Sequence, residues 1–108
     1  MITRITKFQI TTEQRTAFSE FMHQFKDELI SVKGCRHFDV LQDKNEDDML
    51  FMFMIWEDDE KLEEFRASDL NRLLTRKIET FTKSEPTTWT VETVFDPEEL
   101  KQQKSLFD

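Results

Sequence analysis

Two histidines are the side chains of this chain whose ordinary pKa suits proton transfer near neutral pH. His37 precedes Phe38 in a strand-like segment, where it could act as a general base beside an apolar cavity. The alternative is a half-exposed strand histidine that pairs with Asp39. His23 lies beside Met22, off the apolar stripe of a predicted helix, and we interpret it as a boundary or surface residue. His37 is therefore the candidate catalytic residue.

The other reactive residue types mainly exclude classes of site. The single cysteine, Cys35, rules out an internal disulfide and any multi-cysteine metal centre, and we interpret it as a small buried residue at a strand start. Two histidines cannot build a three-histidine metal site. The single glycine, Gly34, excludes glycine-rich phosphate loops, which need several glycines. From the composition we therefore expect no metal site and no nucleotide cofactor held by a glycine-rich phosphate loop.

The charge balance is acidic. Fifteen basic and 23 acidic residues give a net charge of -8, which argues against a nucleic-acid partner, because such surfaces need clustered Lys and Arg. The acidic run at 43–48 lacks the ligand spacing of a calcium loop and is interpreted as a solvated turn. The acidic run at 57–60 suits the start of a helix.

Targeting signals are not apparent in the sequence. The N-terminal residues contain no apolar stretch typical of a signal peptide. The longest apolar run, residues 49–56, is much shorter than the ~20 residues that span a bilayer. The prediction is a soluble cytoplasmic protein without a membrane partner.

The elements that would position these side chains follow from hydrophobic periodicity. We predict strands at 2–10, 35–42, 49–56 and 87–95, and helices at 12–31, from Asp58 or Asp59, and from Ser68 to Phe81. This β-α-β-β-α-β order, with the second helical region split, indicates one ferredoxin-like α+β domain over residues 1–95. Such a domain has a four-stranded antiparallel sheet with helices on one face, and its third strand lies between the first and second. Residues 96–108 form a tail, either a short docked helix or a frayed end.

The third predicted strand is apolar on both faces. One face carries Met49, Phe51, Phe53 and Ile55, and the other carries Leu50, Met52, Met54 and Trp56. Helices bury only one face, and monomers rarely expose four large apolar side chains together. A second copy of the chain, RNA or the tail could cover the other. Acidic charge and the scarcity of stacking aromatics weaken the RNA alternative. We predict a homodimer and assign the first set to its interface, while the sequence leaves open which face meets the partner.

Three segments resemble the antibiotic-biosynthesis monooxygenase domain family, which has the dimeric α/β barrel architecture. They are GCRHFDV at 34–40, MFMIWEDDEKL at 52–62 and FRASDL at 65–70. The resemblance extends over about residues 2–95 and implies a homodimer whose sheets face each other. It also implies a pocket between sheet and helices in each protomer. Members include cofactor-free oxygenases of aromatic polyketides and quinols, heme-degrading monooxygenases, and proteins without a known substrate.

The resemblance also implies residues for the pocket. Trp56 stands where family members place a pocket-lining tryptophan, although it could equally be a core residue under the last helix. The expected ligand pocket consists of Trp56, Phe38, Asn71, Arg72 and Thr75.

The resemblance does not carry heme-degrading activity to this chain. Thr75 occupies the position of the heme-ligand histidine, nineteen residues after the tryptophan, and residues 5–8 lack the family's asparagine. The oxygenases of polyketides also use a tyrosine, which this chain lacks. The implied function is a cofactor-independent monooxygenase acting on an aromatic or quinol-like molecule. The alternative is a non-catalytic dimeric module that binds or senses a small apolar molecule.

Overall fold

A computed structural model describes residues 1–95 of the chain. Its elements, in chain order, are β1 (Ile2–Gln9), the short 3-10 helix η1 (Thr12–Gln14), α1 (Arg15–Leu29), β2 (Cys35–Gln42), β3 (Met49–Trp56), α2 (Asp59–Arg66), α3 (Asp69–Phe81) and β4 (Thr87–Glu92). The predicted helix at 12–31 is therefore shorter, because its first turn is the separate 3-10 helix. The last strand is also shorter than predicted. The tail at 96–108 lies outside the described residues.

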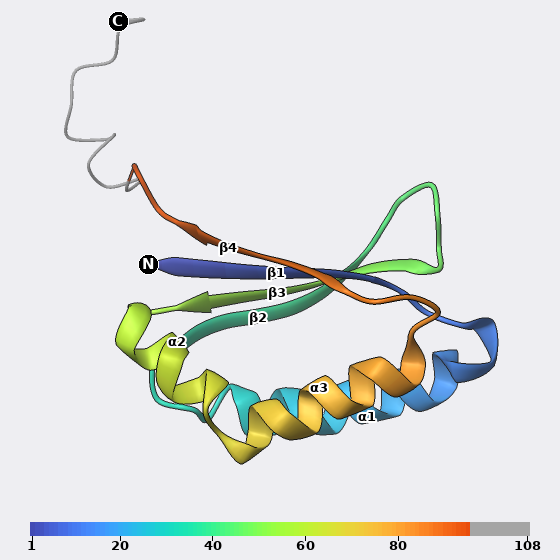
Figure 1. Ribbon diagram of the computed structural model, residues 1–108, viewed down its shortest axis with the longest axis horizontal. Coiled ribbons are helices and arrows are strands. Elements are labelled where there is room, and N and C mark those ends of the chain that lie inside the picture. Colours follow the sequence, from blue (N-terminus) through green and yellow to red (C-terminus); the bar gives the residue numbers. More distant parts are fainter. Residues whose placement is uncertain (96–108) are drawn as a thin grey trace, which may run out of the picture.

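The strands form one antiparallel sheet in the order β2-β3-β1-β4. The central position of β3, between β2 and β1, confirms the arrangement predicted from the sequence. All three α-helices lie on the same side of the sheet, with α1 and α3 running along it (Figure 1). The fold is therefore the ferredoxin-like α+β fold.

Local signals in the sequence fix where the later helices begin. The side chain of Asp58 accepts a hydrogen bond from the backbone N–H of Lys61 at 2.9 Å, and Ser68 Oγ accepts one from Asn71 N–H at 3.2 Å. These bonds satisfy amide groups that the first turn of a helix leaves without partners. Both predicted helix starts are confirmed.

Gly34 connects α1 to β2 in a conformation that other residues rarely adopt. Its φ is +93°, and a Cβ atom there would lie 2.5 Å from both Cβ and Cγ of Lys61. Its carbonyl accepts a hydrogen bond from the amide of Glu57 at 2.8 Å. Glycine is therefore required both by the backbone conformation and by the close approach of α2.

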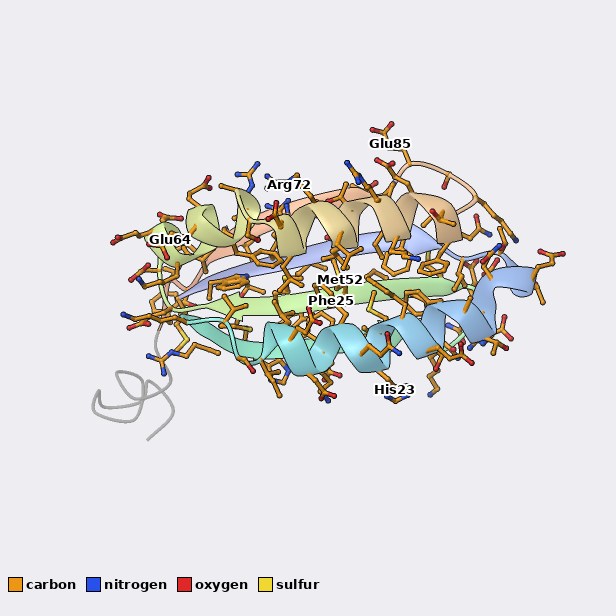
Figure 2. The ribbon with its side chains drawn as sticks, turned by 90° about the horizontal axis from the view of Figure 1, so that it is seen from below. His23, Phe25, Met52, Glu64, Arg72 and Glu85 are labelled. Atoms are coloured by element: carbon orange, nitrogen blue, oxygen red, sulfur yellow. The ribbon has the colours of Figure 1, made fainter. Side chains whose placement is uncertain are left out.

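The core lies between the helices and the sheet. The helices contribute Phe18, Met22, Phe25 and Leu29 from α1, Leu62 and Phe65 from α2, and Leu74, Ile78 and Phe81 from α3. The ring of Phe18 packs edge-on against both Phe8 and Phe81, with centroids 5.6 Å apart in each pair. Figure 2 shows Phe25 and Met52 in the space between α1 and α3. Each large apolar side chain buried here stabilises the fold by about 1.5–3 kcal/mol.

The opposite face of the sheet is not covered by any element of residues 1–95 (Figure 1). On β3 the helices bury Leu50, Met52, Met54 and Trp56, which leaves Met49, Phe51, Phe53 and Ile55 half-buried on this open face. Trp89 and Val91 of β4 lie on the same face, because each is opposite a β1 residue that is itself opposite Phe53 or Ile55. Their exposed fractions are 45% and 47%. Among the described helices, none is long and apolar enough to cross a membrane.

Candidate functional site

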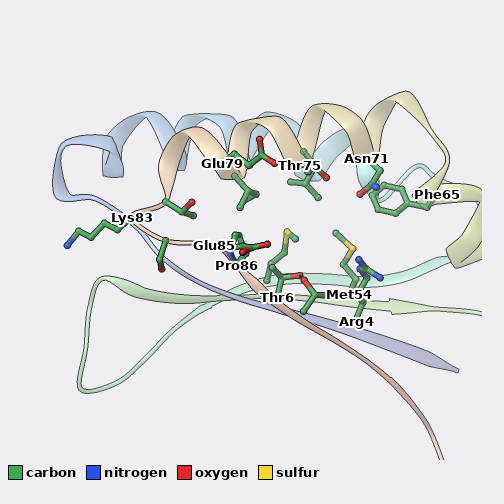
Figure 3. A pocket seen from close by; sticks show the side chains of 16 residues that line it. Arg4, Thr6, Met54, Phe65, Asn71, Thr75, Glu79, Lys83, Glu85 and Pro86 are labelled. Carbon is green, nitrogen blue, oxygen red and sulfur yellow. The ribbon is translucent and has the colours of Figure 1, made fainter.

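A cavity of about 630 Å³ lies between α3 and the sheet, and we call it the α3 cavity. The strands line it with Arg4, Thr6, Met52, Met54 and Thr88. The helices line it with Phe65, Asn71, Leu74, Thr75, Ile78 and Glu79. The connection from α3 to β4 adds Thr82, Lys83, Ser84, Glu85 and Pro86. Figure 3 shows the α3 side chains above, the strand side chains below, and Phe65 at one end. The cavity thus combines an apolar interior with a few polar and charged groups, which is the usual composition of a ligand site.

Strand β1 supplies two polar groups to the cavity. Side chains alternate between the faces of a strand, so Arg4 and Thr6 share the helix-covered face with the buried Ile2 and Phe8. Thr6 is only 7% exposed, and its hydroxyl lies 3.1 Å from that of Thr88 on β4. The threonine pair therefore satisfies its own hydrogen-bonding groups at the base of the cavity.

Helix α3 supplies the facing polar groups. Asn71, Thr75 and Glu79 follow one another at intervals of four residues, so they lie along one side of the helix. The side-chain nitrogen Nδ2 of Asn71 donates a hydrogen bond to the backbone carbonyl of Arg66 at 3.2 Å. This bond orients the side chain and leaves its Oδ1 as an acceptor. Figure 3 shows Asn71 and Thr75 on the side of α3 that faces the strands.

The guanidinium of Arg4 is the cationic group nearest the apolar end of the cavity, beside Met54 and on the side of Phe65 (Figure 3). Burial lowers the pKa of Arg4 from its ordinary value, the charge of Arg66 lowers it further, and Glu63 acts in the opposite direction. An arginine remains protonated despite such a shift. Nη1 of Arg4 donates a long hydrogen bond to Thr90 Oγ1 at 3.4 Å. Arg4 therefore presents a partly desolvated positive charge to the cavity.

The connection between α3 and β4 closes the other end, where Lys83 lies (Figure 3). The Lys83 amide donates to the Gln9 carbonyl at 2.9 Å, and its ammonium lies 3.6 Å from Asp48 Oδ2. The Gln9 side chain donates to the same carboxylate at 2.6 Å. This hydrogen bond, together with the charge of Lys83, lowers the pKa of Asp48 although desolvation opposes the shift. The connection is therefore tied to the turn between β2 and β3.

Two of the five residues expected in the ligand pocket, Asn71 and Thr75, line the α3 cavity. Phe38 lies instead between β2 and α1, where it packs on Phe25 with ring centroids 5.9 Å apart and borders a smaller groove of about 350 Å³. Arg72 points away and pairs with Asp69 in the preceding turn. The structure therefore brings Asn71 and Thr75 together in the cavity lining and leaves the other three residues outside it.

Trp56, the third of those three, is completely buried behind the cavity lining. Its indole stacks on Phe65, with centroids 4.8 Å apart and planes 28° apart. Its Nε1 has no hydrogen-bond partner among residues 1–95. The position matches the core alternative considered for this tryptophan, and its link to the cavity passes through Phe65.

His37 lies on the open face of the sheet, opposite the α3 cavity. Its Nε2 is 3.6 Å from Asp39 Oδ2, and its ring lies edge-on to Phe53 with centroids 6.0 Å apart. A bulge in the pairing between Cys35 and His37 accompanies this placement. A proton acceptor for a ligand in the cavity must therefore come from another residue.

Cys35, at the start of β2, is half-buried rather than fully buried. Burial raises the pKa of its thiol, and a hydrogen bond with the carbonyl of His37, at 3.8 Å from Sγ, opposes the shift. A thiol held in its neutral form is a poor nucleophile. Within residues 1–95, no group of three or more potential ligands is placed to hold a metal ion.

Several lining residues were not predicted from the sequence, and Arg4 is the one for which the sequence carried a signal. The signal was present, because an arginine at a core-facing position of a strand, between Ile2 and Phe8 in the same alternation, needs a reason to be there. The other missed residues, such as Met52, Phe65 and Glu79, carry no comparable signal. Their roles depend on how far α3 stands from the sheet.

Comparison with known families gives one match. The family model described as "Antibiotic biosynthesis monooxygenase" matches residues 1–72. This range includes β1, β3 and the first turn of α3, and therefore much of the cavity lining. No curated protein matches the chain.

Solved structures with low sequence identity share the fold. A conserved protein from Methanosarcina mazei Go1 is similar with a TM-score of 0.78 and 20% identity, covering 83% of this chain and 89% of its own. Rv0793 from Mycobacterium tuberculosis gives 0.79 and 14%, covering 89% and 97%. A structure named as an antibiotic biosynthesis monooxygenase gives 0.77 and 16%, covering 87% and 99%. The described chain therefore corresponds to nearly the whole of each of these structures.

Proposed function

Since the chain belongs to the antibiotic biosynthesis monooxygenase family, we propose that it is a monooxygenase-like protein that acts on an aromatic or quinol-like molecule in the α3 cavity. The cavity is the observation that carries the proposal. Its volume of about 630 Å³ lies within the range of small-molecule sites. Met52, Met54 and Phe65 offer apolar surfaces on which a flat ring can pack.

The proposed reaction needs no cofactor, because the substrate supplies the electrons. With an anthrone-type substrate, an activated ring CH₂ group loses a proton, and the resulting carbanion reduces O₂ and combines with it as a peroxide. Loss of water then leaves a carbonyl, so one oxygen atom enters the product and the other leaves as water. The protein contributes orientation, exclusion of water and removal of the proton.

The first proton needs an acceptor within reach of the ligand. Because His37 lies on the other face of the sheet, the carboxylates of Glu79 and Glu85 are the lining groups suited to this role. Thr75 and Asn71 can hydrogen-bond to a ring oxygen and fix the orientation of the substrate.

A second function is a binding or sensing module without catalysis. The observation that favours it is the composition of the cavity, whose described lining contains no histidine, cysteine or tyrosine. Such a module would bind the same class of aromatic molecule but leave O₂ untouched.

Oxygen consumption separates the two functions. We expect the protein to consume O₂ with members of a panel of anthrones and hydroquinones. Thr75→Phe, which narrows the cavity, should lower that rate roughly tenfold or more, because a misplaced substrate loses the benefit of orientation. Leu73→Phe is the matched control, because Leu73 lies on the same helix, is 43% exposed and does not line the cavity. Saturable binding of the panel without O₂ consumption would instead support the binding module.

We also propose that two copies of the chain pack through the open face of the sheet. The open face carries one contiguous apolar surface, made of half-buried Phe51, Phe53 and Ile55 and exposed Trp89 and Val91. Contiguous apolar surfaces of this kind mark interaction sites, whereas single exposed apolar residues do not. A twofold pairing of this face would bury it against itself. Because the α3 cavity lies on the other side of the sheet, each copy keeps its own cavity accessible.

A further inference from the structure

We propose that the α3 cavity selects aromatic molecules that carry a carboxylate, and that Arg4 is the residue that recognises the carboxylate. The inference rests on the proposed use of the cavity as the ligand site, and it adds the chemical class of the ligand. Its basis is a cation placed at the apolar end of the cavity, with no acidic residue paired to it among residues 1–95.

Arg4 occupies a position where most strands carry an apolar residue. It lies on the helix-covered face of β1, two residues from buried Ile2 and two from buried Thr6. The side chain is half-buried, and it extends beside Met54 in the space under α3 (Figure 3). The backbone of β1 thus holds the guanidinium at the base of the cavity rather than in bulk solvent.

Within the part of the chain that the structure describes, the charge of Arg4 has no counter-charge in an ion pair. None of the ion pairs among residues 1–95 includes it, and Glu63, the nearby acidic residue, pairs with Arg66 at 3.0 Å. Glu79 and Glu85 line the cavity, but neither forms an ion pair with Arg4. A partly buried cation without an acidic partner costs free energy, and an anionic ligand would recover it.

The geometry suits a carboxylate attached to a ring. A guanidinium presents planar pairs of N–H donors that match the two oxygens of a carboxylate. Met54 and Phe65, which are 2% and 3% exposed, lie at the same end of the cavity and provide flat apolar contacts for the ring (Figure 3). The cationic Lys83 lies at the other end and is already paired with Asp48. The carboxylate is therefore expected at the Arg4 end.

The test compares two probes of the same shape, 2-naphthoate and its neutral amide, 2-naphthamide, by isothermal titration calorimetry at pH 7. We expect the full-length protein to bind 2-naphthoate about tenfold more tightly, because hydrogen bonds to a charged acceptor are about twice as strong as neutral ones. Equal affinity for the two probes, or no binding of either, would overturn the inference.

Variants assign the preference to Arg4. Arg4→Gln and Arg4→Met should each bind 2-naphthamide as the parent does and lose most of the tenfold preference. Arg76→Gln is the matched control: it removes the same charge from the exposed surface of α3, outside the cavity lining, and should keep the preference. Retained binding of 2-naphthamide shows that a variant is folded. If Arg4→Gln fails this check, Arg4→Met decides.

The same measurements distinguish failure of this inference from failure of the proposed function. A parental preference in the Arg4 variants would overturn the role of Arg4 while leaving the cavity as the ligand site. If Thr75→Phe bound both probes as the parent does, the cavity itself would not be the ligand site. Both proposals would then fall.

Discussion

The indole of Trp56 stacks on the ring of Phe65 with centroids 4.8 Å apart, and Phe65 in turn lines the α3 cavity. The tryptophan at the end of β3 therefore supports the cavity from behind, because it fixes the ring that a ligand would touch. Trp56 therefore contributes to the stability of the fold, whereas its neighbour Phe65 is available for contact with a ligand.

Replacement of Trp56 is expected to affect stability much more than binding. Trp56→Ala should lower the free energy of unfolding by about 3–5 kcal/mol, because it leaves a large void in the core. Trp56→Phe should cost less, because it retains an aromatic ring and removes an N–H that has no partner among the described residues. Urea denaturation measures both changes.

Ligand binding provides the check on this assignment. Trp56→Phe should bind 2-naphthamide with nearly parental affinity, because the indole does not line the cavity. Loss of that binding without loss of stability would mean that Trp56 contacts the ligand directly.

Introduction of a charge on the open face is expected to prevent association. Phe53→Asp should change the mass measured by light scattering from about 26 kDa, twice the chain's 13.1 kDa, to that of one chain. A buried, unpaired carboxylate at the interface is too costly for the dimer, whereas half-buried Phe53 leaves the monomer core intact. Leu73→Asp on α3 is the control and should remain dimeric. A parent protein that is monomeric at micromolar concentration would contradict the dimer.

Stability should depend on Asp48 at neutral pH but not in acid. Its folded pKa lies below the ordinary value of ~3.9, so its contribution is present above that value and disappears as the pH falls through the folded pKa. Asp48→Asn should therefore lower the thermal midpoint by a few degrees at pH 7 and leave it nearly unchanged near pH 2. Asp47→Asn removes a neighbouring charge without the contacts to Gln9 and Lys83. A similar loss in both variants at pH 7 would show that net charge alone is responsible.

The fold was largely predictable, because its information is local. The spacing of Phe18, Met22, Phe25 and Leu29 predicts α1. Because β3 is apolar at every position, its sequence also predicts that one apolar face remains after the helices are packed. The order of strands and helices along the chain then predicts the ferredoxin-like arrangement. The start of α1 was less predictable, since a 3-10 turn and an α-helical turn have nearly the same apolar pattern.

The candidate site was predictable only in part. Asn71 and Thr75 lie on the side of α3 that faces the cavity. They were predictable because the family resemblance implies a pocket between the sheet and the helices. Phe38 and His37 are adjacent in sequence but lie on opposite faces of β2, and a bulge at this point makes the face hard to assign from alternation. The role of Arg4 depends on the fact that no acidic residue among residues 1–95 pairs with it, and sequence patterns do not show which charges pair in the fold.

The alternation of β1 has a consequence for how this chain can change. Arg4 lines the cavity, while Ile5 pairs with Phe53 and Trp89 on the open face. If the rest of β1 keeps its pairing, an insertion or deletion of one residue directly after Ile5 would exchange the two sets, moving Arg4 to the apolar surface and Ile5 to the cavity. Length changes of one residue within β1 would thus damage both surfaces at once, whereas changes of two residues would preserve the assignment of faces.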